Sequence, residues 1–162
     1  MTRFFSRRTL SFAVVLALAL GAAGLAGAAG EVSGKYVGNG TPAKLAHALV
    51  LPHEEFSGKK AYTLVLTEKD PAKQEKPDFW ASFGKLGHAL IINVDVEGGI
   101  FGTQVAHQGL EKSGFSSSGS LSVEGFKLDG GMLSGRFYTD GVQEFFGDKW
   151  EVDLTVKAPL PK

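Results

Sequence analysis

Apolar and polar residues alternate along several stretches of this chain, and no other feature of the sequence constrains its fold as strongly. In the stretch 150–157 every second residue is apolar, and the residues between them are charged or carry a hydroxyl group. The stretches 88–96 and 62–67 show a similar repeat. Successive side chains of a β-strand point to opposite faces, so a repeat of two residues is typical of a strand that buries one face. We therefore expect a chain that is rich in strands.

Short glycine-containing turns separate the expected strands. Glu97–Gly99 and Asp129–Gly131 each stand between two apolar stretches, and glycine supplies the positive φ angle that tight hairpin turns need. Because most consecutive strands are joined in this way, an antiparallel up-and-down meander is favoured over a Greek key. We predict an all-β, mainly antiparallel barrel or sandwich of about eight strands, at 34–38, 44–51, 61–67, 88–96, 100–107, 115–123, 132–139 and 149–157.

One stretch has the spacing of a helix. Phe79, Trp80 and Phe83 lie three to four residues apart in the segment 77–84, which predicts one short amphipathic helix. We expect this helix to cover an open end of the β structure.

The first thirty residues have the zones of a bacterial export signal. Three arginines precede an apolar stretch, the segment 21–30 contains only Gly, Ala and Leu, and Ala26–Ala28 has the small residues that a signal peptidase accepts. We predict a signal peptide at 1–30 and a single soluble domain at 31–162, which is periplasmic or secreted and keeps no membrane anchor after cleavage. The pair Arg7–Arg8 leaves the general and the twin-arginine export routes open.

Charge and cysteine content exclude several classes of function. The chain balances 17 Lys and Arg against 17 Asp and Glu, and the three arginines of the leader leave with it, so the segment 31–162 carries a net charge of −3. Such a domain is not expected to bind nucleic acid, whose phosphates require a basic surface. The chain contains no cysteine, so any metal site would have to use His, Asp, Glu or backbone oxygen atoms.

Five short segments carry a resemblance to known proteins: Gly34–Tyr36, Leu45–Ala48, Leu64–Thr67, Phe115–Gly119 and Glu144–Asp148. Together they resemble a family of small exported bacterial β-rich proteins. That family has no assigned activity, so the resemblance implies a compact β domain and nothing about catalysis.

The histidines are the first candidates for chemistry. By alternation, His47, His88 and His107 fall on the apolar sides of their expected strands, whereas His53 follows Pro52 in an expected loop. One interpretation is that each histidine is separate, neutral and hydrogen-bonded in the interior. The other is that His47 and His107, joined by His88, converge and bind a divalent metal ion or a polar ligand, because imidazole binds transition metals well.

The aromatic residues are the second group of candidates. We expect Trp80, Phe83 and Phe146 to gather with other rings at one end of the β structure, where they pack as a lid or line a pocket for an apolar ligand. The serine row at 116–122 lacks the sequence context of a nucleophile. We expect it to be a solvated strand face, with the binding of a diol or a sugar as the alternative.

These features favour a binding module over an enzyme, and no catalytic residue is assigned. We expect an exported, non-enzymatic protein that binds a small ligand or a protein partner through His47, His88, His107, Trp80, Phe83 and Phe146. One alternative is a metal-binding protein or metal-assisted hydrolase that uses the three histidines with a divalent metal ion as cofactor. The other is a structural or interaction component of the cell envelope that uses an exposed strand edge.

Overall fold

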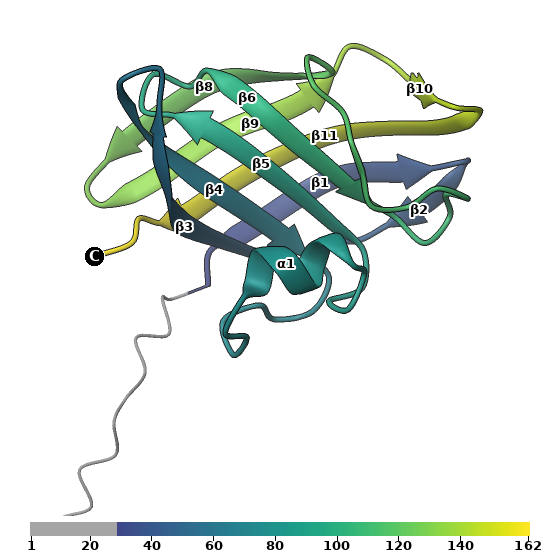
Figure 1. The fold of residues 1–162 in the computed structure, drawn as a ribbon, viewed down its shortest axis with the longest axis horizontal. Coiled ribbons are helices and arrows are strands. Elements are labelled where there is room, and N and C mark those ends of the chain that lie inside the picture. The colour runs from purple at the N-terminus through teal and green to yellow at the C-terminus, as the bar shows by residue number, and fades with distance from the viewer. Residues whose placement is uncertain (1–28) are drawn as a thin grey trace, which may run out of the picture.

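The computed structural model describes residues 29–162 and contains two β-sheets and one short helix (Figure 1). The all-β, mainly antiparallel architecture confirms the expected fold class. The predicted signal peptide at 1–30 lies almost wholly outside the described residues. The elements in chain order are β1 (Glu31–Gly38), β2 (Thr41–Ala43), β3 (His47–Phe56), β4 (Lys59–Thr67), α1 (Pro77–Ser82), β5 (Ala89–Asp95), β6 (Ile100–Ala106), β7 (Phe115–Ser116), β8 (Leu121–Asp129), β9 (Met132–Thr139), β10 (Gln143–Phe145) and β11 (Asp148–Pro159).

The two sheets pack face to face as a sandwich. One sheet has the strand order β3-β4-β5-β6-β7, so every strand pairs with its neighbours in the sequence, as a meander requires. The other sheet has the order β2-β1-β11-β9-β8, and the short β10 pairs with β11. Figure 1 shows the strands of the two sheets crossing at an angle, with α1 across one end of the five-stranded sheet. Within residues 29–162 the sheets do not close into a barrel, so the sandwich alternative is the one observed.

The main core lies between the inner faces of the two sheets. Trp150, Tyr36 and Phe137 are the largest fully buried side chains there. The Tyr36 hydroxyl donates a hydrogen bond of 3.0 Å to the Ala89 carbonyl oxygen and thereby links the two sheets. Burial raises the pKa of Tyr36, so this hydroxyl stays protonated and remains a donor.

Helix α1 covers one part of the outer face of the five-stranded sheet. Pro77 occupies the start of the helix, where a backbone N–H group would have no partner within the helix, so its absence costs nothing. The helix contacts β4, β5 and β6. Within the described residues no helix is long and apolar enough to cross a membrane.

A second apolar cluster fills the space beneath α1 and consists of Leu49, Val65, Ala81, Leu86, Ala89, Ile91 and Ala106.

Two expected strands depart furthest from the observed ones. The stretch 115–123 is not one strand, because β7 belongs to one sheet and β8 to the other. The chain crosses between the sheets at 117–120, where the Ser117 and Ser120 hydroxyls share a hydrogen bond of 2.6 Å. The expected row of serines on a single strand face therefore does not form. The strand expected at 44–51 begins later and continues past Pro52, so His53 lies in β3 and not in a loop.

The long outer strands β3 and β8 are both irregular. The pairing of β3 shifts register between His53 and Phe56, after Pro52, which has no N–H group to offer to another strand. The pairing of β8 shifts register between Glu124 and Lys127. Irregular, proline-containing or charged edges are typical of sheets that avoid adding a further strand.

Candidate ligand-binding cleft

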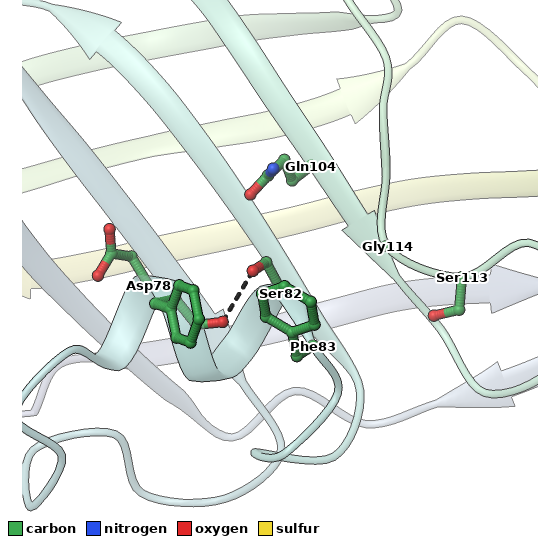
Figure 2. Close-up of a pocket in the computed structure, with 7 residues that line it drawn as sticks. Asp78, Ser82, Phe83, Gln104, Ser113 and Gly114 are labelled. Carbon is green, nitrogen blue, oxygen red and sulfur yellow. Dashed lines mark hydrogen bonds between the residues drawn. The ribbon is translucent and has the colours of Figure 1, made fainter.

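A cleft of about 510 Å³ opens between α1 and the segment that leads into β7 (Figure 2). In Figure 2, Asp78 and Ser82 lie on α1, Phe83 follows its last residue, and the backbone at 113–114 lies on the opposite side. Gln104 of β6 lies between these two walls. The volume is in the range of small-molecule sites, which is about 300–1,000 Å³.

Two phenylalanine rings, one on α1 and one directly after it, line this cleft and remain exposed. The exposed fraction is 48% for Phe79 and 65% for Phe83, and their ring centroids lie 4.8 Å apart. Trp80 contacts Phe79 at a centroid distance of 5.3 Å but does not line the cleft. The helix turns Pro77 and Ala81 toward the sheet, which leaves the rings on its outer side. Contiguous exposed apolar surface is typical of ligand-binding grooves and interaction sites.

Hydrogen bonds hold two serine hydroxyls of the cleft in place, and two further polar side chains have hydrogen-bonding groups that a ligand can use. The Ser82 hydroxyl donates to the Phe79 carbonyl oxygen at 2.8 Å, and the Ser113 hydroxyl accepts from the His107 N–H group at 2.9 Å. No side-chain hydrogen bond within residues 29–162 engages the Asp78 carboxylate or the Gln104 amide. Asp78 is the only charged residue among those that line the cleft.

Gly114 sets the width of the cleft. Its φ angle is 86°, a conformation that favours glycine. A Cβ atom at this position would lie 3.0 Å from the Ser82 carbonyl oxygen. Its N–H group donates to the Val105 carbonyl oxygen at 2.8 Å. The segment can therefore pass close to α1 while it remains attached to β6.

Two of the candidate histidines meet, but they do so behind the cleft. The ring centroids of His88 and His107 lie 4.4 Å apart, and His107 also meets the edge of Tyr36 at 4.8 Å. His107 is fully buried, whereas His88 is partly exposed. Neither ring lines the cleft, and His107 contributes to it only through the backbone bond to Ser113.

His107 is held as a neutral imidazole. The Gly109 N–H group donates to its Nδ1 at 3.0 Å, which places the ring proton on Nε2. Nε2 has no hydrogen-bond partner. The nearby Thr41 carbonyl group raises the pKa of His107, but this is the smallest of the three effects on it. Burial and, to a smaller extent, the proximity of His88 lower the pKa of His107 to about 4.

The prediction that His47 joins His107 is wrong. His47 pairs with Thr67, and Thr67 pairs with Ala89. Ala89 in turn pairs with Ala106, and directly paired residues share one face of a sheet. His107 follows Ala106 and therefore points to the opposite face, so His47 and His107 cannot hold one metal ion. No group of three or more His, Asp or Glu side chains in the described part of the chain is arranged to hold a metal ion.

Phe146 belongs to a second aromatic group. It lies in the turn between β10 and β11 with a φ angle of 50° and is 78% exposed. Its ring meets Phe145 at 4.7 Å, and the Lys112 ammonium group lies 5.4 Å from its centroid. Phe145 stacks on Phe115 at 4.2 Å. The candidate rings Trp80 and Phe83 thus lie in one group and Phe146 in another, where the sequence predicted a single group.

Asp148 anchors the wall that carries Ser113. Its carboxylate accepts hydrogen bonds from the N–H groups of Glu111 at 3.0 Å and Lys112 at 2.8 Å. It also accepts one from the Asn39 amide at 2.7 Å. The two backbone N–H groups, and then Asn39, lower the pKa of Asp148 against the opposing effect of burial. The sequence suggests only a turn residue here, because its partners lie far away in the chain.

The sequence identified the aromatic side of the cleft better than the polar side. Trp80 and Phe83 were expected on a helix, and Phe83 lines the cleft. Gln104 could have been found as a polar residue that alternates with the apolar face of its strand. Ser113 lies in a loop without any periodic signal, so only the fold reveals it.

No protein-family model matches this chain, and no similar protein was found among the curated proteins or the solved structures. These comparisons add neither a family nor an activity to the resemblance noted above. The function must therefore be inferred from the cleft itself.

Proposed function

We propose that the chain is an exported, non-enzymatic binding protein that holds a small ligand in the cleft beside α1. The observation that supports this proposal is the pair of exposed rings, Phe79 and Phe83, beside the unengaged polar groups of Asp78 and Gln104. A small-molecule site typically combines an apolar surface with a few converging hydrogen-bonding groups.

The lining selects a ligand with an apolar face and several uncharged hydrogen-bonding groups. The rings of Phe79 and Phe83 offer a surface for the apolar face. The amide of Gln104 and the hydroxyl of Ser113 can both donate and accept hydrogen bonds. The carboxylate of Asp78 disfavours an anionic ligand, because like charges at short distance repel.

We place this activity in the periplasm or outside the cell because of the leader predicted at 1–30. The fold needs no disulfide bond, since the chain contains no cysteine. Its folding therefore does not depend on the redox state of the compartment.

The proposal is tested by tryptophan fluorescence and thermal unfolding of the domain at 29–162. The panel of probes contains monosaccharides, disaccharides, nucleosides, amino acids and short peptides. Trp80 is 40% exposed beside Phe79, whereas Trp150 is 1% exposed in the core, and the chain has no other tryptophan. A ligand in the cleft is expected to change the emission of Trp80 and to raise Tm further as the ratio of free ligand to Kd increases.

Phe83→Ala is expected to weaken binding about tenfold or more, because it removes the most exposed ring that lines the cleft. Its effect on unliganded stability should stay within about 0.5 kcal/mol, as for other exposed positions. Phe146→Ala is the matched control, since this ring is also exposed but lies at the β10–β11 turn. The proposal is wrong if no probe binds, or if the control loses affinity while Phe83→Ala keeps it.

A further inference from the structure

A second hollow of about 270 Å³ adjoins the cleft on the outer face of the five-stranded sheet. Asp78 and Gln104 line both hollows. The two hollows therefore adjoin, and together we call them the trough. It begins beside α1 and extends across the sheet, and the second hollow adds about half of the cleft's volume.

The outer face of the sheet changes character where α1 ends. Beneath the helix the face is apolar and includes Val65 and Ile91. In the next row Thr63 pairs with Asn93, and Asn93 pairs with Gly102. Across the strands β4, β5 and β6, this row thus presents a hydroxyl group, an amide group and a glycine. All three residues line the second hollow. The part of the face that the helix leaves open is thus both polar and hollowed.

The Asn93 amide has a fixed orientation. The Thr63 hydroxyl donates to its Oδ1 at 2.9 Å, so its Nδ2 is the group turned toward Gly102. A Cβ atom at Gly102 would lie 2.8 Å from that Nδ2. The amide therefore presents donors to the hollow, and the exposed hydroxyls of Ser116 and Ser118 add groups that both donate and accept.

Aromatic rings close the far end of the trough. β3 and β6 are separated by two strands in the sheet, yet His53 of β3 meets Phe101 of β6 at a centroid distance of 5.2 Å. Phe56 stacks on the same ring at 4.0 Å. Side chains of β3 and β6 therefore meet across the two strands that separate them. Because His53 also lines the second hollow, rings bound the trough at both ends.

We propose that the trough binds an extended, uncharged carbohydrate chain. A sugar unit has an apolar ring face and hydroxyl groups that donate and accept. The trough offers the phenyl rings of Phe79 and Phe83 at one end and the His53 imidazole at the other, with amide and hydroxyl groups between them. Its floor is the face of a sheet, whose backbone groups already pair with neighbouring strands. Side chains must therefore recognise the ligand, whereas an extended peptide is commonly held through the free backbone of a strand edge.

This inference rests on the proposed function, because the cleft beside α1 serves as the first subsite. It adds that affinity rises with chain length, since only a longer ligand reaches the second hollow. The measurement is the Kd of the domain at 29–162 for soluble oligomers of glucose and of N-acetylglucosamine, from the monosaccharide to the hexasaccharide. In at least one series the hexasaccharide is expected to bind about tenfold or more tightly than the monosaccharide.

Two variants test the second hollow alone. Gly102→Ala places a methyl group where the Asn93 amide lies, and Ser118→Trp fills the hollow from an exposed position. Both should remove the gain in affinity with chain length and leave monosaccharide binding unchanged. Ser122→Trp is the matched control, because this exposed serine lies on β8 in the other sheet. Ser122→Trp should keep the increase in affinity with chain length.

The outcomes separate this inference from the proposed function. If affinity is the same for all lengths in both series, or if Ser118→Trp keeps the gain, the extended carbohydrate ligand is wrong and a single-subsite cleft remains. If a peptide or nucleoside binds with dependence on Phe83 and no sugar does, the carbohydrate class is wrong while the proposed function stands. If no probe binds, both are wrong. Should Gly102→Ala fail to fold, Ser118→Trp decides the question.

Discussion

The buried imidazole of His107 is packed against Tyr36, His88 and the backbone of β1. A Cβ atom at Gly38 would lie 2.5 Å from its Nδ1, so only glycine allows β1 to approach the ring this closely. Because Nδ1 accepts from the Gly109 N–H group, a proton added to Nδ1 would break this hydrogen bond and place a charge in the interior. The fold therefore stabilises the neutral ring and depends on it.

Lowering the pH should destabilise the domain through His107. Its pKa is about 4 in the folded chain and about 6.5 in the unfolded chain. Between these values the unfolded state binds a proton that the folded state does not bind. The contribution of His107 is therefore fully present above about pH 6.5 and falls by at most about 3 kcal/mol as the pH decreases to about 4. Urea unfolding at a series of pH values measures this slope.

His107→Gln removes the titrating ring and keeps a side-chain acceptor near the Gly109 N–H group. Its free energy of unfolding is expected to be lower at neutral pH but nearly independent of pH between about 6.5 and 4.5. The half-buried His53 provides the control variant His53→Gln, which should keep the wild-type slope. An unchanged slope in His107→Gln would show that another group causes the pH dependence.

Among the structural elements, the segment 107–114 is held by hydrogen bonds to distant parts of the chain. Asp148, at the start of β11, accepts two of its backbone N–H groups, and Asn39 donates to the Gly109 carbonyl oxygen at 3.1 Å. The Asn39 side chain also accepts a hydrogen bond from the Lys149 N–H group at 2.8 Å. One wall of the cleft is therefore positioned by the turns that follow β1 and β10.

Asp148→Asn should loosen this wall without unfolding the sheets. The amide can accept fewer hydrogen bonds than the carboxylate, so the N–H groups of Glu111 and Lys112 should exchange with solvent faster. Tm should fall by several degrees, and affinity for a cleft ligand should decrease. The lowered pKa of Asp148 stabilises the fold above the unfolded-state pKa, and this stabilisation is lost as the pH falls through the folded-state pKa.

Hydrogen exchange followed residue by residue checks this expectation. Asp129→Asn is the matched control, since Asp129 is exposed at the end of β8, in the six-stranded sheet. Protection of Glu111 and Lys112 that is unchanged in Asp148→Asn would mean that other contacts hold the segment.

The whole molecule is a sandwich in which the first and last long strands lie side by side. β1 pairs with β11 from Glu31–Lys157 to Gly38–Trp150, so the six-stranded sheet is complete only when both ends of the domain are in place. Pairing across such a sequence separation is typical of β proteins that fold slowly. The five-stranded sheet, in contrast, consists of sequential pairs.

Alternation predicted most strands because the core lies between two sheets that each bury one face. It could not tell which face of β3 points inward, because Leu49 is buried under α1 on one face and Val50 in the main core on the other. His47 was for this reason placed with His107. The crossing at 117–120 was missed because a run of serines fits a solvated strand as well as a loop.

The central claim is that a ligand binds in the trough beside α1. Backbone amide NMR of the domain at 29–162 tests it most directly. The titration uses the tightest-binding probe of the panel or of the oligosaccharide series. We predict shift changes at Phe83, Gln104 and Ser118, with the β10–β11 turn at Phe146 unchanged. Changes centred on Phe146 or on the six-stranded sheet, with the amides of α1 unaffected, would contradict it.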